Sequence, residues 1–102
     1  MAFEGNALWA PVFAGDRLLF KDVEDGRLVF DRESCETRLL SPLSQFVVQQ
    51  LEQADRPLRT ADFVRAVQAE EPEASLQECL LAVEDALTAL GQARLIRMAD
   101  AQ

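Results

Sequence analysis

The side chains that most often perform acid–base or metal chemistry are scarce in this chain. It has no histidine, so the usual general base near neutral pH is absent and imidazole ligands for zinc are excluded. Cys35 and Cys79 are far apart and neither belongs to a C-x-x-C pair, so they cannot supply a four-ligand metal site. The four glycines are scattered and form no phosphate-binding loop. We therefore expect no catalytic residue, no metal, no cofactor and no enzymatic activity.

The two cysteines have different expected roles. Cys79 falls on the apolar border of a predicted helix, which indicates core packing rather than a nucleophile. Cys35 falls in a polar turn, where it would be exposed and oxidisable, with Arg32 or Arg38 as the nearest basic residues. Two cysteines do not make a disulfide framework in a chain with cytosolic character, so we expect free thiols.

The charge of the chain narrows its partners. Ten basic residues against eighteen acidic ones give a formal net charge of −8. Binding to a duplex depends on neutralising phosphates with Lys and Arg, so this charge opposes nucleic acid. The same charge could serve solubility alone, and the acidic run at Glu70, Glu71 and Glu73 is most simply a solvated loop.

Hydropathy argues against a membrane protein and against export. Apolar runs such as Leu80-Leu81-Ala82-Val83 are far shorter than the roughly 20 residues that span a bilayer. The start, MAFEGNALW, has no basic region before an apolar block and no small-residue cleavage site, so we expect no secretory signal. The sequence predicts a soluble cytoplasmic protein.

The first half of the chain has the pattern of a small sheet. Residues 1–15 are expected to be an irregular lead-in, because Pro11 argues against a central strand, although its apolar residues could cover part of a core. Three short antiparallel strands are predicted within residues 17–40, with a hairpin turn that closes on Asp25-Gly26. The apolar residues of the lead-in are Phe3, Leu8, Trp9, Val12 and Phe13.

The second half, residues 42–90, predicts three helices. Ser41 caps a helix that starts on Pro42 and ends near Ala54. Thr60 is expected to cap a second helix over residues 61–69. Ser75 and Glu78 form a capping box for a third helix that ends at Leu90, with Gly91 as its left-handed terminal residue. Residues 94–98 are expected to be a short extended tail. The predicted stripes are Leu43, Phe46, Val47, Leu51 and Ala54, then Phe63, Val64 and Val67, then Leu76, Leu80, Val83, Leu87 and Leu90.

These elements predict one α+β domain over residues 1–102, with a three-stranded antiparallel N-terminal sheet followed by a three-helix bundle. The arrangement is that of a winged-helix-like domain. A DNA-reading member needs a recognition helix with basic and amide side chains on its exposed face. Here the third helix is expected to expose Gln77, Glu84, Asp85 and Thr88, so DNA binding is kept only as the weakest alternative.

Several motifs together resemble a known family. They are Leu28-Val29-Phe30-Asp31, then Ser34, then Thr37-Arg38-Leu39-Leu40-Ser41-Pro42-Leu43, and a leucine-rich last helix ending in Leu-Gly before Leu95-Ile96. Over residues 17–97 the chain resembles the PqqD-like peptide chaperones, or RiPP recognition elements, of the bacterial HPr-rel-A systems. Many members have Gly-Asp-Thr-His where this chain has Cys35-Glu36-Thr37-Arg38.

The resemblance implies a biosynthesis accessory protein that does no chemistry itself. Such domains bind a precursor or leader peptide as an added strand, between the third strand and the third helix, and present it to a partner modifying enzyme. On this chain that implies a site along Glu36, Thr37, Arg38, Leu39 and Leu40, facing the last helix.

The last helix carries small residues beside its core stripe. On a helical wheel, Cys79, Ala82, Ala86 and Ala89 flank one side of the stripe. They could let a peptide backbone approach closely, or they could simply be good helix formers packed near the first helix. Leu81 lies on the polar side, where it is either an ordinary exposed leucine or a contact in a homodimer. A structural or regulatory dimerising subunit of a larger enzyme complex is thus the alternative function.

Overall fold

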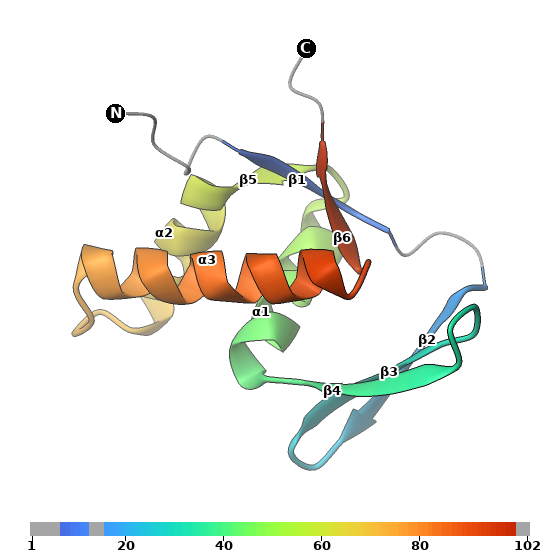
Figure 1. Ribbon diagram of the computed structural model, residues 1–102. Coiled ribbons are helices and arrows are strands. Elements are labelled where there is room, and N and C mark those ends of the chain that lie inside the picture. Colours follow the sequence, from blue (N-terminus) through green and yellow to red (C-terminus); the bar gives the residue numbers. More distant parts are fainter. Residues whose placement is uncertain (1–6, 13–15, 100–102) are drawn as a thin grey trace.

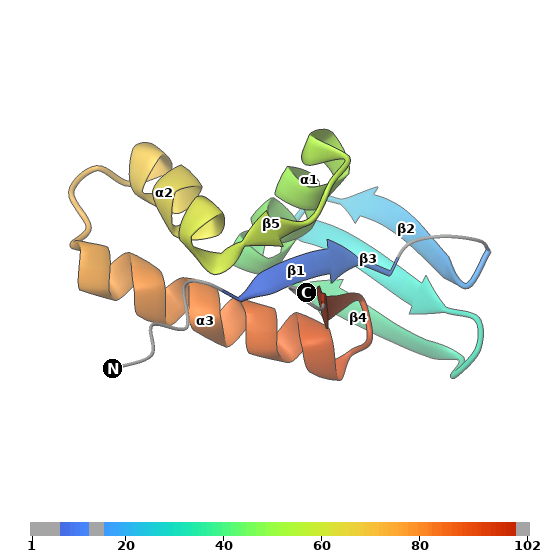
Figure 2. The same cartoon turned by 90° about the horizontal axis from the view of Figure 1, so that it is seen from above.

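The computed structural model describes residues 7–12 and 16–99, in which three helices lie between two small antiparallel sheets (Figure 1). The predicted α+β class is confirmed, with a second sheet that the sequence did not predict. Figure 2 shows the same layers from above, with β1 crossing over the helices on the side away from β4.

The N-terminal sheet has the predicted three strands. β2 (Leu18–Val23), β3 (Gly26–Asp31) and β4 (Glu36–Leu40) follow one another in the order β2-β3-β4. A two-residue turn joins Val23 to Gly26, which has a φ of +150°. A Cβ at Gly26 would lie 2.9 Å from the Leu40 carbonyl oxygen, so both the backbone conformation and the close approach of β4 require glycine.

Capping signals fix the starts of two helices. α1 (Pro42–Ala54) begins where predicted, because the Ser41 hydroxyl accepts from Ser44 N at 3.1 Å. α3 (Leu76–Gln92) begins at the predicted capping box, in which Ser75 Oγ accepts from Glu78 N at 3.1 Å and Glu78 Oε1 accepts from Ser75 N at 2.9 Å. These local rules therefore place both helices in the sequence.

The expected irregular lead-in is wrong where the structure describes it. β1 (Leu8–Pro11) is the central strand of a sheet ordered β5-β1-β6, with β5 (Leu58–Arg59) and β6 (Ile96–Ala99). Pro11 is tolerated because it is the last residue of the strand. The tail predicted over residues 94–98 is extended only from Ile96 onward, and there it is a paired strand, whereas Arg94 lies in the turn after α3. Phe3 and Phe13 lie outside the described residues.

Two helix ends also differ from the prediction. Thr60 does not cap α2 (Thr60–Glu70); it is its first residue, and its hydroxyl instead accepts from Trp9 Nε1 at 2.8 Å. Gly91 is inside α3 rather than at its end. The left-handed residue that follows is Arg94, with a φ of 65°. At Thr60 a contact with a distant segment overrides the local capping signal, and α3 continues two residues beyond its predicted end.

The core lies where α1, α2 and α3 meet the inner face of each sheet. Its fully buried side chains include Val47, Val48, Leu51, Phe63, Val83, Leu87, Leu90, Leu95 and Ile96. Leu76 was predicted in the core stripe, but it is 61% exposed because it opens α3, away from the centre of the bundle. The rest of that stripe is buried or half-buried, so the bundle holds the exposed face of α3 in a fixed direction.

Candidate functional site

The open edge of β4 exposes the main chain of two residues. Arg32 N donates to Arg17 O at 2.8 Å, and the register continues through Leu19–Phe30, Lys21–Leu28 and Val23–Gly26. Since hydrogen-bonded and non-bonded pairs alternate in an antiparallel ladder, β3 uses its other residues to bond Glu36, Arg38 and Leu40. The N–H and C=O groups of Thr37 and Leu39 therefore point to the outer edge, where residues 7–12 and 16–99 provide no further strand.

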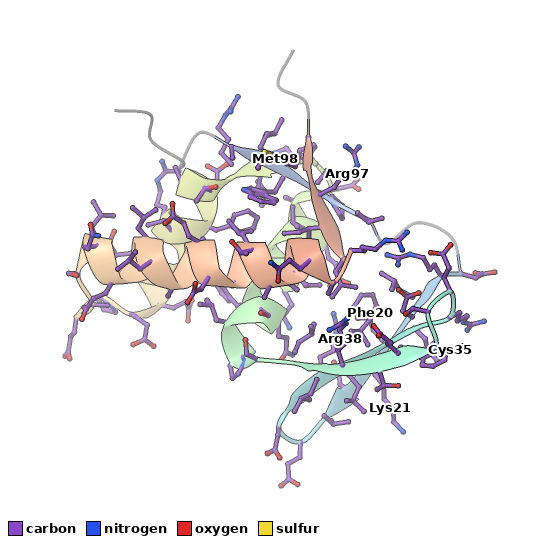
Figure 3. All side chains as sticks on the ribbon, in the orientation of Figure 1. Phe20, Lys21, Cys35, Arg38, Arg97 and Met98 are labelled. Atoms are coloured by element: carbon purple, nitrogen blue, oxygen red, sulfur yellow. The ribbon has the colours of Figure 1, made fainter. Side chains whose placement is uncertain are left out.

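The side chains of β4 divide between the two faces of the sheet. Leu40 is buried against the helices, so Glu36 and Arg38 share its face, since alternate residues point the same way. Figure 3 shows Arg38 and Phe20 on the side of the sheet toward α3, and Lys21 on the opposite side. Arg38 Nη2 lies 2.8 Å from Glu36 Oε1. The edge is thus flanked by an ion pair on the inner face and by the exposed Thr37 and Leu39 on the outer face.

The small residues of α3 line a cleft at the end of β4. A cavity of about 470 Å³ lies between the start of α1 and the second half of α3. Its lining residues are Ser41, Leu43, Ser44, Ala82, Asp85, Ala86 and Ala89. Ser41 follows directly after β4, so the structure brings the predicted strand and the predicted helix face together at this residue. Cys79 is buried at 2% exposure and serves the core, as expected.

Two residues of α1 were missed as site residues. Leu43 and Phe46 were expected in the core, but they are half-buried and line clefts, as does the exposed Pro42. The sequence contained a signal for this, because Phe46 and the buried Leu51 are five positions apart and therefore lie about 140° from each other on a helical wheel. An apolar face that wide exceeds what one packed neighbour covers.

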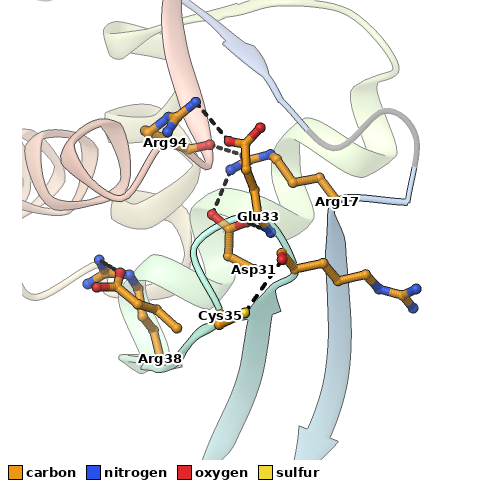
Figure 4. Close-up of polar contacts among 8 residues, drawn as sticks. Arg17, Asp31, Glu33, Cys35, Arg38 and Arg94 are labelled. Carbon is orange, nitrogen blue, oxygen red and sulfur yellow. Dashed lines mark hydrogen bonds and ion pairs between the residues drawn. The ribbon is translucent and has the colours of Figure 1, made fainter.

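A set of polar contacts ties the β3–β4 loop to the end of α3 (Figure 4). Arg17 Nη1 donates to Asp31 Oδ2 at 2.7 Å, and Arg17 Nη2 donates to the Arg94 carbonyl oxygen. Arg94 Nη2 in turn lies 3.2 Å from Glu33 Oε1. These contacts join segments that are distant in sequence and hold β4 beside α3.

The pKa of Asp31 reflects this environment. Desolvation by burial would raise it, but hydrogen bonds from the backbone of Glu33 and Ser34 and the charge of Arg17 outweigh that effect, so the pKa of Asp31 is lowered. Glu33 N donates to Asp31 Oδ1 at 2.9 Å. The carboxylate is therefore held in its charged form as a fixed acceptor at the start of the loop.

A second tie holds the other end of the sheet to α1. Arg27 Nη1 lies 3.3 Å from Glu52 Oε1, and Arg27 Nε lies 3.0 Å from Asp22 Oδ1. Burial would lower the pKa of Arg27, but the two carboxylates raise it overall. The guanidinium also stands 5.2 Å from the centre of the Phe20 ring. With both ends tied, the open edge of β4 keeps its position relative to the helices.

The turn before β4 accommodates cysteine where many PqqD-like sequences have glycine. Cys35 is exposed and has a left-handed φ of 61°, a conformation that glycine favours. Its thiol lies 3.8 Å from the Arg32 carbonyl oxygen, and its N–H donates to Asp31 O at 2.7 Å. The loop thus takes a glycine-like turn and delivers the chain directly into β4.

The surface of α3 is close to that predicted from the sequence. Leu81 is exposed, as predicted, at 56%. Of the four polar residues expected on the surface of α3, Gln77, Asp85 and Thr88 are exposed and Glu84 is half-buried. Within residues 7–12 and 16–99, no three His, Cys, Asp or Glu side chains gather as metal ligands. None of the helices in the same ranges has the length and apolar character needed to cross a bilayer.

No family model and no curated protein matches this sequence. Among solved structures, the fold is similar to that of TbiB1 in complex with the TbiA(beta) leader peptide. The TM-score is 0.68 and the identity 20%, with 84% of this chain and 96% of that chain covered. The chain therefore shares the fold of that protein.

Proposed function

We propose that this protein is a non-catalytic peptide-binding adaptor that holds an extended precursor or leader peptide against β4 for a partner modifying enzyme. The observation that carries the proposal is the open edge of β4, where the main chain of Thr37 and Leu39 is free beside a cleft lined by Ala82, Ala86 and Ala89. An added strand would bond these free groups, and its side chains would reach the cleft.

The β4 edge and the cleft beside it have different roles in binding. Main-chain bonds to Thr37 and Leu39 are independent of the peptide's sequence, so they supply affinity, whereas the cleft beside Ala86 and Ala89 supplies selectivity. The fold that this chain shares with TbiB1, whose structure contains a leader peptide, supports the same role. The sequence motifs support a finer assignment to the PqqD-like chaperones of HPr-rel-A systems, acting as a biosynthesis accessory protein in the bacterial cytoplasm.

Nuclear magnetic resonance tests this function directly. The isotopically labelled protein is titrated with synthetic precursor segments encoded beside its gene, and backbone amide shifts are followed. We expect the largest shifts at residues 36–40 and along the Ala82–Ala89 face of α3. The absence of amide shifts along residues 36–40 with every such segment would overturn the proposed function.

A dimerising or docking subunit is the second candidate function. The outer face of the sheet exposes Leu19 and Leu39, at 52% and 56%, in addition to Leu81 on α3. Apolar side chains of this kind can join two copies or attach the protein to an enzyme. Light scattering separates the candidates, because a stable dimer that covers β4 would leave no edge for a peptide. DNA binding is disfavoured by α3, which has three carboxylates and no basic residue.

A further inference from the structure

A second and larger cleft lies between the three helices. Its volume is about 570 Å³, and it opens between the start of α1, the end of α2 and the first half of α3. Apolar residues make most of its lining, namely Pro42, Leu43, Phe46, Val67, Ala74, Cys79 and Ala82. A cleft of this size and character can bury one or two large apolar side chains.

The mouth of this interhelical cleft is acidic. Glu70, Glu71 and Glu78 belong to its lining and are exposed, and none of them forms an ion pair with a described residue. Glu70 is the last residue of α2 and Glu71 is its C-cap, in a last turn that contains no basic residue. A carboxylate at the C-terminal end of a helix opposes the helix dipole. These two charges therefore destabilise the free protein, and a cation brought by a ligand would relieve them.

The interhelical cleft continues into the one beside β4. Leu43 and Ala82 line both cavities. A bound peptide that extends past the Leu40 end of β4 would therefore pass from the cleft beside β4 into the interhelical cleft. The sheet of β2, β3 and β4 is entirely antiparallel, and a strand added to it in the same manner runs opposite to β4. Its first residues then lie near Leu40 and Ser41, and its last residues leave near Cys35. The residues that precede the added strand are the ones that reach the interhelical cleft.

We propose that the interhelical cleft binds the segment of the precursor or leader peptide that precedes the added strand. This inference rests on the proposed function. This segment places a large apolar side chain between Phe46 and Ala82 and sets a lysine or arginine against Glu70 and Glu71. The occupant is thus an apolar and basic peptide segment on the N-terminal side of the strand. It gives the site a second selectivity element and fixes the direction in which the peptide lies.

The test uses a displayed library of random 20-residue peptides, selected on the full chain. We expect the bound peptides to be enriched in an apolar residue next to a lysine or arginine. The same selection is repeated on Glu70→Gln/Glu71→Gln, and on Glu73→Gln as the matched control, because Glu73 lies in the same acidic run but outside the cleft lining. The basic preference should disappear only in the double variant. At low salt, that variant should bind a selected peptide roughly three- to tenfold more weakly, with the difference fading at high salt.

A stability measurement keeps the result interpretable. Removing two carboxylates from the C-terminal end of α2 should raise the thermal midpoint, so weaker binding cannot come from unfolding. A nitroxide on the N-terminus of a selected peptide should broaden amide signals of residues 70–82. Broadening at residues 33–35 instead would overturn the proposed direction.

The remaining outcomes separate the two claims. The selected peptides could bind more weakly to Thr37→Pro, which shows that they need the β4 edge, and yet show no preference for an apolar residue next to a basic one. That result would overturn this inference and leave the proposed function standing. A selection that yields no peptide dependent on the β4 edge would overturn the proposed function, and the inference with it.

Discussion

Arg17 donates from Nη1 to Asp31 Oδ2 across 2.7 Å, and its second terminal nitrogen donates to the carbonyl oxygen of Arg94. One guanidinium thereby joins the start of the first hairpin to Arg94, the second residue after α3, which has a left-handed φ of 65°. These two hydrogen bonds fix the distance between the β3–β4 loop and α3. They therefore also fix the position of the β4 edge relative to α3. The geometry of the candidate site therefore depends on a contact outside it.

Replacing Arg17 with lysine should lower stability although it keeps the charge. A single ammonium cannot donate in two fixed directions as the planar guanidinium does. Loss of one hydrogen bond to a charged group should lower the thermal midpoint by about 4–8 °C, as calorimetry would record. Arg32→Lys, at an exposed residue of the same β3–β4 loop, is the control and should change little. Equal midpoints for the two variants would show that the Arg17 contacts do not position the loop.

The Asp31 contact should also appear in the pH dependence of folding. Because the folded protein lowers the pKa of Asp31, its stabilising contribution is complete above the ordinary value of about 3.9 and is lost as pH falls through the lower folded value. Urea midpoints of wild type and Asp31→Asn should differ at neutral pH and converge in acid. Glu24→Gln, which removes an exposed turn carboxylate, controls for net charge. A difference that stays constant down to pH 2 would contradict the assigned cause.

Two glycines should respond to alanine in opposite directions. Gly26→Ala should destabilise the fold by about 1–3 kcal/mol, because of its φ of +150° and the Leu40 carbonyl 2.9 Å from the new Cβ. Gly91→Ala should stabilise it by about 0.5–1 kcal/mol, because Gly91 lies within α3 and its Cβ would make an ordinary contact with Trp9 Cζ3, at 3.9 Å. Chemical denaturation measures both. A stable Gly26→Ala would mean that β4 does not approach the turn so closely.

Filling the clefts should weaken peptide binding without unfolding the protein. Ala82 lines both cavities and is half-buried, so Ala82→Leu would fill the space at their junction. We expect affinity for a bound peptide to fall by about tenfold or more, since a side chain displaced from its pocket loses roughly 1.5–3 kcal/mol. Ala69→Leu, at an exposed position of α2 that lines neither cavity, is the matched control. Equal affinities, measured by calorimetric titration, would place the peptide elsewhere.

Local signals in the sequence predicted most of the fold. The Ser-Pro start of α1, the capping box of α3 and the turn before Gly26 each depend on neighbouring residues, so they could be recognised without a structure. The sheet of β5, β1 and β6 could not, because its strands come from three distant parts of the chain and no local turn announces their pairing. For the same reason Thr60 looked like a cap, when its hydroxyl serves the indole of Trp9.

Some residues of the candidate site could be predicted from the sequence and others could not. The strand Glu36–Leu40 and the small residues of α3 follow from sequence motifs and from a helical wheel. The role of Leu43 and Phe46 does not, since half-burial at a cleft and full burial in a core both require an apolar residue. Only the register of β2, β3 and β4 shows that Thr37 and Leu39, rather than Arg38, offer their main chain to a partner.

That register gives the sharpest test of the account. Thr37→Pro removes an N–H that points to the open edge and leaves the ladder with β3 intact, a position at which edge strands tolerate proline. Asp22→Pro is the matched control, because the same register points the Asp22 N–H to the opposite edge, along β2. Asp22→Ala is measured beside it, because it removes the same exposed carboxylate, and its contact with Arg27, without adding a proline. Calorimetric titration with one bound peptide should show a loss of about tenfold or more for Thr37→Pro and near wild-type affinity for Asp22→Pro. Wild-type affinity in a folded Thr37→Pro variant would contradict strand addition at β4.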